Sequence, residues 1–185
     1  MIFVTTTVAM TGWLLLHPGV AGTAVADVPV GPGPTNYTEQ AQPPPGTCHW
    51  HSAANGETLP DPICTPGAIN PKVTQDTLAN TICKSGYTKS IRPPASITKA
   101  EKYANAAAYG YTGAMSDIEY DHLVPLELGG DPNDARNLWV EPGESPNPKD
   151  EIEHKLHQLV CAGKVALTEA QEAIATDWTT ALDVA

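Results

Sequence analysis

The chain has 185 residues, of which 10 are Lys or Arg and 21 are Asp or Glu, so its formal net charge is −11. This acidic balance argues against a wholly basic protein that coats nucleic acid. Hydrophobic residues make up 41% of the sequence, enough for one core, which excludes a fully disordered chain. The length corresponds to one domain, and no stretch after the N-terminal region is long and apolar enough to span a membrane.

Residues 1–26 carry no charged side chain and are mostly apolar as far as Leu16. Ala24-Val25-Ala26 then places small residues at the −3 and −1 positions of a signal-peptidase site. We therefore expect a secretory signal peptide over residues 1–26; a retained anchor helix is the alternative. The protein is expected to be secreted or associated with the cell envelope, without membrane attachment once the signal is cleaved.

Four cysteines follow, at positions 48, 64, 83 and 161. Export would place them in an oxidising compartment, where an even number favours disulfide bonds. Of the three possible pairings we expect Cys48 with Cys64 and Cys83 with Cys161, because this pairs local cysteines with each other. The cluster Cys48-His49-Trp50-His51 is an alternative metal site, although no second Cys or His pair completes it.

The first elements after the signal are irregular. Residues 27–47 contain six prolines and few large apolar side chains, which predicts an extended Pro-rich linker. Residues 48–71 are rich in Pro and Gly and are expected to form loops held by Cys48 and Cys64. A single domain is expected over residues 48–185.

Helices and strands are predicted further along the chain. Thr74 is a suitable cap for a short helix that reaches Cys83, and a capping box formed by Thr98 and Glu101 opens a helix to about Ala108. Residues 118–124 are β-rich and alternate, which predicts a strand. Gly129-Gly130-Asp131-Pro132 forms a turn, and residues 137–141 form the return strand.

The last two predicted elements are helices. Asn147 followed by Pro148 has the pattern of a helix cap and first helical position, and the helix should reach about Cys161. Its expected apolar stripe consists of Ile152, Leu156, Leu159 and Val160. A second capping box, from Thr168 to Gln171, opens the final helix. The expected fold class is α+β and helix-rich, with a small β-hairpin and helix as core over about 117–161, flanking helices and disulfide stabilisation.

The residues that carry chemistry gather in this core. Asp121 and His122 end the first strand, where neighbouring side chains point to opposite sides. One can therefore hold a metal ion while the other faces a water molecule. Asn137 begins the return strand, and the next helix adds further oxygen ligands, namely Asn147, Asp150 and Glu153.

These segments resemble a known family. Asp121-His122-Leu123-Val124-Pro125, then Gly129-Gly130, then Asn137-Leu138-Trp139 and a helix with Lys149-Asp150 and Glu153 are similar to the HNH nuclease module, also called the ββα-metal fold. More narrowly, they resemble secreted actinobacterial proteins of HNH type. The resemblance covers about a quarter of the chain. It implies hydrolysis of phosphodiester bonds in DNA or RNA.

The resemblance also implies residue roles. His122 would be the general base, Asn137 would orient it or brace the loop, and Asp121 would hold a divalent metal ion. The chemistry agrees, because His titrates near neutral pH and a cation stabilises charge that develops on a phosphate. A hard carboxylate oxygen suits Mg²⁺ or Mn²⁺, with Zn²⁺ as an alternative.

The pattern departs from the family on the helix. Many members carry a His or Asn ligand there, at the position that Pro146 occupies in this chain. Asp150 and Glu153 are the two leading substitutes, and Asn147 is the third because it is expected to cap the helix. His154 and His157 lie on the outward side of the same helix and are expected to be solvated.

Charge is distributed unevenly along the chain. Eleven acidic and two basic side chains lie between positions 117 and 153, whereas six basic and two acidic ones lie between 72 and 102. The basic segment is the candidate for gripping a phosphate backbone, with Lys89 and Arg92 as contacts, although a solvated basic face is the alternative. Lys149 contacts phosphate or neutralises Asp150 and Glu153. We expect a monomer that binds nucleic acid with weak sequence specificity.

A non-catalytic function is the main alternative. The acidic balance and the missing helix His favour an HNH-like secreted binding or cell-envelope protein. A secreted toxin with the same chemistry is a third hypothesis. Gly129 and Gly130 are expected to serve turn geometry, and Trp139 is expected in the core.

Overall fold

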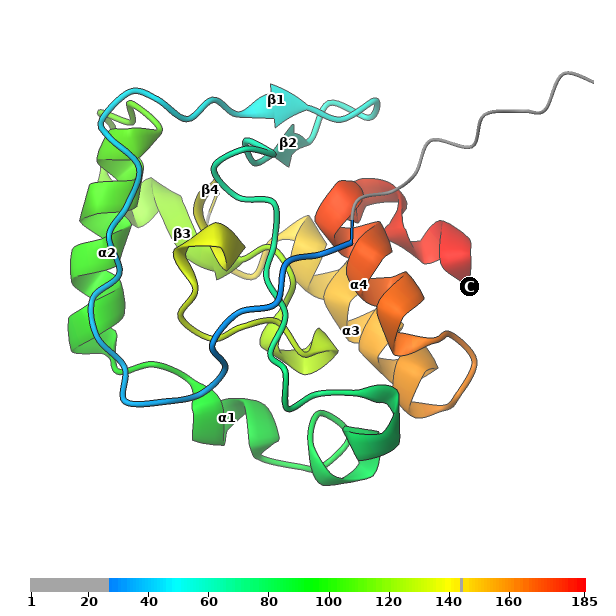
Figure 1. Ribbon diagram of the computed structural model, residues 1–185. Coiled ribbons are helices and arrows are strands. Elements are labelled where there is room, and N and C mark those ends of the chain that lie inside the picture. The colour runs from blue at the N-terminus through cyan, green and yellow to red at the C-terminus, as the bar shows by residue number, and fades with distance from the viewer. Residues whose placement is uncertain (1–26, 144) are drawn as a thin grey trace, which may run out of the picture.

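Helices alternate with two small antiparallel sheets in the computed structural model, which describes residues 27–143 and 145–185 (Figure 1). The predicted signal peptide, residues 1–26, lies outside the described residues. The strands are β1 (His51–Ser52), β2 (Thr58–Leu59), β3 (Ile118–His122) and β4 (Leu138–Pro142). The α-helices are α1 (Tyr87–Ile91), α2 (Ala95–Ala108), α3 (Pro148–Cys161) and α4 (Leu167–Thr176). Five 3₁₀ helices lie in the described residues: Gln75–Asn80, Met115–Asp117, Leu126–Leu128, Ala135–Asn137 and Trp178–Val184.

The β3–β4 ribbon is the centre of the fold. It lies between α2 on one side and the α3–α4 pair on the other (Figure 1). Ile118 pairs with Pro142 and His122 with Leu138, so residues 120 and 122 share one face of the ribbon while 119 and 121 share the other. The ladder ends at His122, two residues earlier than the alternation predicts, because the Asn137 side chain, not a strand, receives the Val124 amide.

The first turn of α3 forms as the sequence predicts. The Asn147 side chain accepts hydrogen bonds from the amides of Lys149 and Asp150, and Pro148 occupies the first helical position. Leu156 and Val160 are fully buried, with Ile152 and Leu159 packed against the same cluster. The predicted start, end and apolar stripe of this helix are confirmed.

Two predicted capping boxes are wrong. Helix α2 begins at Ala95, before Thr98. Glu101 does not cap the helix, because it is buried and accepts a hydrogen bond from the backbone amide of Gln40 at 2.8 Å. Helix α4 is capped at Ala166, where the Glu169 side chain reaches back to the amide. Gln171, predicted to close the second box, donates instead to the Leu128 carbonyl at 2.8 Å, so both predicted side chains are engaged by partners distant in sequence.

The predicted disulfide pairing is confirmed. Cys48 is bonded to Cys64, and Cys83 is bonded to Cys161. The second bond ties the segment after the first 3₁₀ helix to the end of α3. Closing a loop of 78 residues restricts the unfolded chain and should contribute about 4 kcal/mol in the chain-entropy model. The bond of Cys48 also removes its thiolate from the alternative metal site proposed around it.

The Pro-rich segment 27–47 is extended, as predicted, but it is hydrogen bonded along the domain and belongs to the folded unit. The Gly31 amide donates to the Ile69 carbonyl at 2.9 Å, and the Gly46 amide donates to the Ala107 carbonyl at 2.9 Å. The expectation of a linker is corrected accordingly. A sequence without apolar periodicity gives no sign of such backbone pairing.

Two hydrophobic clusters stabilise the domain. One joins α3, α4 and the C-terminal 3₁₀ helix, and the other joins the end of α2 to the β3–β4 ribbon. Trp139 is fully buried in the second cluster, which confirms its predicted core position. Within residues 27–143 and 145–185, none of the helices combines the length and the apolar character needed to cross a membrane.

Candidate active site

His122 is a buried histidine at the end of β3, with 7% of its surface exposed. Its Nε2 lies 3.0 Å from the carbonyl oxygen of Pro132. A carbonyl only accepts hydrogen bonds, so Nε2 carries the proton and the neutral ring keeps its lone pair on Nδ1. Burial lowers the pKa of His122 to about 4, although the charge of Asp121 opposes this. The imidazole is therefore uncharged at pH 7, as a base must be.

A depression of about 350 Å³ opens beside His122. Tyr120, His122 and Leu138 line it from one face of the β-ribbon, as their shared position in the register requires. The opposite wall comes from the segment that leads into α2 and its first turns, residues 92–102. The predicted general base is thus placed at the edge of a cavity that solvent can enter.

The wall opposite His122 is basic. Lys102 donates to the carbonyls of Met115 and Ile118 at 2.7 and 2.6 Å, so it holds the entry into β3. Arg92 and Lys99 supply the remaining positive charge of the lining. The charge of Arg92 contributes to lowering the pKa of His122.

Of the three predicted phosphate contacts, only Arg92 lies at the depression. Arg92 lines the depression, whereas the exposed Lys89 is not among its lining residues. Lys99, which also lines the depression, belongs to the predicted basic segment 72–102 but was not singled out there as a contact. Lys149 is fully buried, so its predicted contact with a phosphate backbone is wrong for this conformation.

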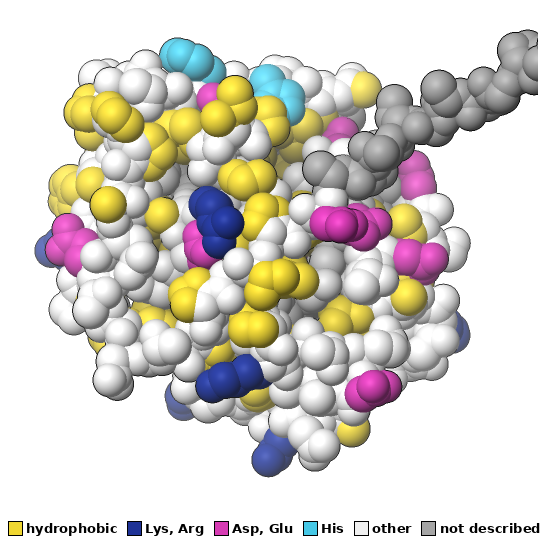
Figure 2. All heavy atoms as spheres, viewed as in Figure 1, with side chains coloured by type: hydrophobic (Ala, Val, Ile, Leu, Met, Phe, Trp, Pro, Cys, Tyr) yellow, Lys and Arg dark blue, Asp and Glu magenta, His cyan; other side chains and the backbone are white. Residues whose placement is uncertain are grey.

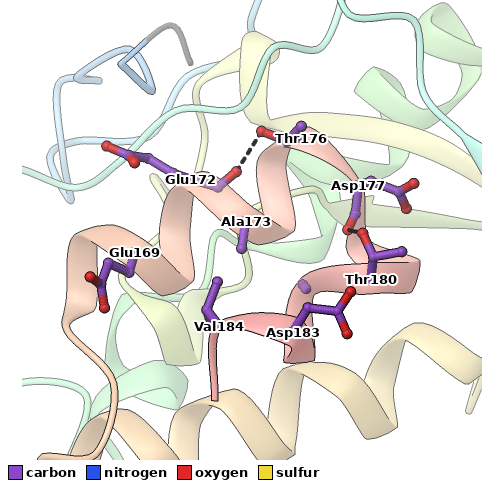
Figure 3. A pocket seen from close by; sticks show the side chains of 9 residues that line it. Glu169, Glu172, Ala173, Thr176, Asp177, Thr180, Asp183 and Val184 are labelled. Atoms are coloured by element: carbon purple, nitrogen blue, oxygen red, sulfur yellow. Dashed lines mark hydrogen bonds between the residues drawn. The ribbon is translucent and has the colours of Figure 1, made fainter. Parts of the chain in front are cut away.

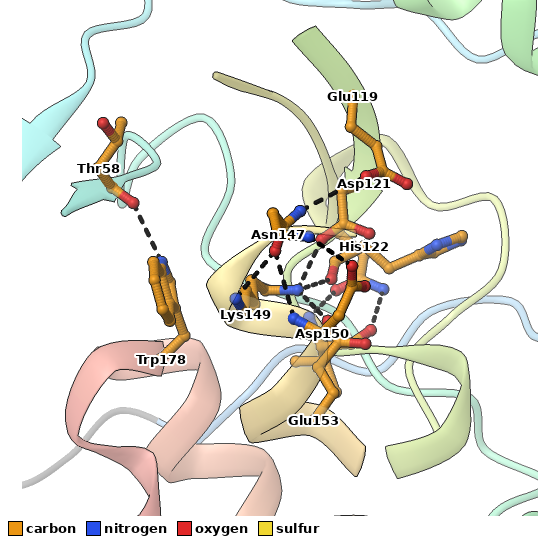
Figure 4. Close-up of polar contacts among 11 residues, drawn as sticks. Thr58, Glu119, Asp121, His122, Asn147, Lys149, Asp150, Glu153 and Trp178 are labelled. Carbon is orange, nitrogen blue, oxygen red and sulfur yellow. Dashed lines mark hydrogen bonds and ion pairs between the residues drawn. The ribbon is translucent and has the colours of Figure 1, made fainter. Parts of the chain in front are cut away.

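Lys149 instead binds the opposite face of β3. Its ammonium donates to Asp121 Oδ2 at 2.6 Å, to the backbone carbonyl of His122 at 2.8 Å, and to the carboxylate of Glu153. Figure 4 shows Asp121 from β3 meeting Lys149 and Glu153 from the start of α3. Burial alone would raise the pKa of Asp121, but the charge and hydrogen bond of Lys149, together with His122 and Glu141, outweigh it and hold that pKa below its usual range.

Glu141 is a further acid of this cluster that sequence reasoning missed. It pairs across the ribbon with Glu119, on the same face as Asp121. Glu141 is 4% exposed, and its Oε2 has no hydrogen-bond partner among the described residues. Burial and the charge of Asp121 raise the pKa of Glu141 to about 9. The strand register could have revealed this acid, because it pairs Glu141 with Glu119 across the ribbon.

The cluster therefore holds more carboxyl groups than its one ammonium can neutralise. Burial raises the pKa of Glu153 to about 8, although Lys149 counteracts part of this effect. At pH 7 both Glu141 and Glu153 retain protons in the folded state. A cation that entered the cluster would displace those protons.

Asp150 is separate from this cluster. Its carboxylate accepts a hydrogen bond from the Asn147 amide at 2.8 Å, and so completes the cap of α3. Asn147 uses its own oxygen in the same cap, and its side-chain nitrogen lies 3.4 Å from Glu119. Of the two leading helix candidates, the structure brings Glu153 to Asp121 and leaves Asp150 at the helix terminus.

Asn137 braces the loop between the two strands. It is fully buried, and its amide oxygen accepts hydrogen bonds from the amides of Val124 and Ala68 at 2.9 and 3.2 Å. Its nitrogen donates to the carbonyls of Val124 and Asp131 at 2.9 and 3.0 Å. Because Pro132 follows Asp131 and holds the imidazole of His122, Asn137 positions that ring through the backbone.

The predicted glycine turn has a steric basis in the same loop. A Cβ at Gly130 would lie 1.8 Å from the carbonyl oxygen of Val124, and Gly129 has a φ of +77°. Only glycine fits this packing and this backbone conformation. The two glycines therefore serve the turn, as predicted.

A second depression, of about 330 Å³, lies between α4 and the C-terminal 3₁₀ helix (Figure 3). Its charged lining consists of four acids among the described residues: Glu169, Glu172, Asp177 and Asp183. Such a lining repels phosphate. Figure 2 shows that the face of the molecule viewed in Figure 1 carries scattered charges without a continuous basic patch.

Comparisons with known proteins add no identification. No family model matches the chain, and no curated protein or solved structure is significantly similar to it. Any functional conclusion must therefore come from the residues of the site.

Proposed function

We propose that the protein is a secreted, metal-dependent nuclease of HNH type that hydrolyses phosphodiester bonds of DNA or RNA. The observation that carries this proposal is the state of His122. Its Nε2 is bonded to Pro132, which leaves the Nδ1 lone pair of a neutral ring beside a cavity with basic walls. The similarity of the Asp-His-x-x-Pro, Gly-Gly and Asn-Leu segments to the ββα-metal module supports the same conclusion.

The chain's own residues have distinct tasks in this reaction. Arg92 and Lys99 bind the phosphate group at the mouth of the depression. Nδ1 of His122 takes a proton from the attacking water. The Pro132 carbonyl accepts a hydrogen bond from Nε2–H throughout and fixes the plane of the ring, and Asn137 holds the loop that presents Pro132. Nothing in this arrangement reads a base, so cleavage should depend weakly on sequence.

The acidic cluster fits a hard divalent cation in the kind of donors that it offers. Asp121, Glu141 and Glu153 supply carboxylate oxygens, and the buried Oε2 of Glu141 lacks a hydrogen-bond partner in the described part of the chain. These three residues would hold Mg²⁺ or Mn²⁺. Such an ion would lie on the face of β3 opposite the imidazole of His122, so it would stabilise developing negative charge only on a phosphate that reached past the end of the strand to both faces.

The contacts of Lys149 favour a second candidate function. Its ammonium already neutralises Asp121 and donates a hydrogen bond to Glu153, at the place where a divalent cation would bind. A chain that uses this lysine permanently in place of a metal would be a non-catalytic HNH-like binding or cell-envelope protein. The two functions differ in whether a divalent cation can enter the cluster.

Export is part of the proposal. Two disulfide bonds are typical of proteins that fold in an oxidising compartment. The apolar N-terminal segment that ends at Ala26 is of the kind that directs secretion.

The test is a plasmid-nicking assay of the purified protein with Mg²⁺, Mn²⁺ or Zn²⁺, and with EDTA. The nuclease proposal predicts nicking that depends on the metal and is lost in His122→Ala. Absence of nicking with every metal between pH 6 and pH 9 would favour the non-catalytic function.

A further inference from the structure

One group of potential metal ligands lies outside the candidate active site. Glu127 belongs to the 3₁₀ helix Leu126–Leu128, and His154 and His157 stand one turn apart on α3. One ligand atom from each residue lies within 4.8 Å of those of the other two. Glu127 Oε2 is 3.8 Å from Nδ1 of His154 and 3.7 Å from Nδ1 of His157.

The hydrogen bond made by Nε2 of His157 determines that the lone pair of the neutral ring lies on Nδ1. Its Nε2 lies 2.9 Å from the carbonyl oxygen of Ile82, so Nε2 donates and Nδ1 carries the lone pair. Nδ1 is buried and has no hydrogen-bond partner among the described residues. A buried acceptor without a partner is costly, so this nitrogen requires a ligand.

The tautomer of His154 depends on the side-chain amide of Gln158. The Gln158 nitrogen lies 2.9 Å from His154 Nε2; turning this amide over would place its oxygen there instead, to accept a hydrogen bond from Nε2–H. Nδ1 of His154 then faces Glu127 with a free lone pair. A histidine that ligates a metal typically donates its other ring N–H to a carbonyl or amide oxygen in this manner.

The distances favour a metal over direct hydrogen bonds. Separations of 3.7 and 3.8 Å between Nδ1 and Oε2 exceed the range of an N–H···O bond. A tetrahedral zinc ion with bonds of about 2.0 to 2.1 Å holds its ligand atoms roughly 3.3 Å apart. The two Glu127–histidine distances would have to shorten by roughly 0.5 Å, and the ligand nitrogens of the two histidines already lie within 4.8 Å of each other.

We propose that Glu127, His154 and His157 form a zinc-binding site, with water as the fourth ligand. Two imidazoles and one carboxylate are a set that zinc commonly accepts. The His154 side chain is 62% exposed, so one side of the site is open to solvent. The neighbouring sulfurs of Cys83 and Cys161 are bonded to each other and so do not ligate the ion.

Zinc at this site would join two elements that carry the acidic cluster. Glu127 follows β3, which contributes Asp121, and the two histidines lie on α3, which contributes Lys149 and Glu153. The ion would therefore act as a clamp that holds α3 against the loop after β3. This inference does not depend on nuclease activity.

The test is calorimetric titration of the EDTA-treated, dialysed full protein with Zn²⁺, together with the visible absorption spectrum after addition of Co²⁺. We expect one Zn²⁺ per chain and a d–d spectrum typical of nitrogen and oxygen ligation. His154→Ala should weaken binding at least tenfold, and Glu127→Gln should also weaken it. His49→Ala, a change at an exposed histidine outside the group, should leave affinity unchanged.

His157→Ala removes a part-buried side chain, so its melting temperature must be measured alongside its affinity. His154→Ala retains the fold because that side chain is largely exposed, and it keeps the test decisive. Absence of Zn²⁺ binding by the unmodified protein would overturn the proposal. So would equal affinity in His154→Ala, or a loss of binding in Asp121→Asn alone, which would place the ion in the acidic cluster.

Discussion

The ammonium of Lys149 lies 2.6 Å from a carboxylate oxygen of Asp121, fully buried beneath the strand that also carries the candidate base. The next residue, His122, turns its imidazole to the other face of the β-ribbon and offers its backbone carbonyl to the same ammonium. A charged network and a neutral imidazole are thus held on opposite sides of one strand. Stability and activity should therefore respond to different substitutions.

Replacing Lys149 by Met should destabilise the fold strongly. The change leaves the charge of Asp121 buried without its cation and removes the donor to Glu153, a defect that typically costs about 3 to 5 kcal/mol. Urea unfolding monitored by circular dichroism measures it. Lys155→Met is the matched control, because the Lys155–Glu151 pair on the same helix is exposed and should contribute well under about 1 kcal/mol. Equal stability of the two variants would refute the role given to Lys149.

Stability should fall as pH rises from 6 to 8 in the presence of EDTA. The folded protein keeps protons on Glu141 and Glu153, whose pKa values are raised to about 9 and 8, while the unfolded chain has lost them. The unfolded state therefore binds fewer protons, and each group removes up to about 1.4 kcal/mol of unfolding free energy per pH unit, with a smaller slope as pH approaches its folded pKa. The loss ends once pH exceeds the folded pKa.

Glu141→Gln isolates one of these two groups. The amide mimics the protonated carboxyl, so the decline in stability between pH 6 and 8 should become shallower by about 1.4 kcal/mol per pH unit. Urea unfolding at a series of pH values measures the slope. Glu151→Gln, at a fully exposed acid, should reproduce the unmodified slope. If both variants show the same slope, the protonation assigned to Glu141 is wrong.

Replacing Asn137 by Ala should destabilise the loop that presents Pro132. Four buried backbone groups lose their partner, and each buried unsatisfied group costs about 1 to 3 kcal/mol before relaxation. We expect a loss of at least about 2 kcal/mol in urea unfolding. Asn55→Ala, in an exposed turn, should cost far less. A variant of Asn137 with unchanged stability would contradict the bracing role.

Binding of nucleic acid should depend on Arg92 and Lys99. Fluorescence anisotropy with a labelled DNA duplex, in EDTA to prevent cleavage, measures affinity at several salt concentrations. Replacing either residue by Gln should weaken binding to all sequences alike and reduce the slope of log K against log salt by about 0.7 to 0.9. Lys164→Gln, far along the chain at the end of α3, serves as control. Identical slopes in all variants would show that nucleic acid does not bind at the depression.

Local sequence patterns predicted the parts of the fold that depend on local contacts. The Asn147-Pro148 cap, the glycine turn and the apolar stripe of α3 all follow from nearest neighbours and are found as expected. The disulfide pairing was also correct. The α2 boundary was not, because Glu101 is engaged by Gln40, a residue of the Pro-rich segment that carries no periodic signal.

The residues of the candidate site were also predicted only in part. Asp121, His122, Asn137 and Glu153 were selected from sequence, and the structure places all four around one end of the β-ribbon. The burial of Lys149 and of Glu141 was missed, because charged side chains are expected at the surface. They can be buried because the positive charge of Lys149 on α3 lies against the acidic side chains of the β-ribbon. His157 was expected to be solvated, yet its Nδ1 is buried.

The most direct measurement is the rate of plasmid nicking by His122→Ala compared with the unmodified protein, each with Mn²⁺ and with EDTA. Loss of a general base should reduce the rate by at least about 100-fold, while circular dichroism and melting temperature show a retained fold. The unmodified protein should nick DNA with Mn²⁺ and not with EDTA. An equal rate in His122→Ala, or nicking that persists in EDTA, would contradict the account.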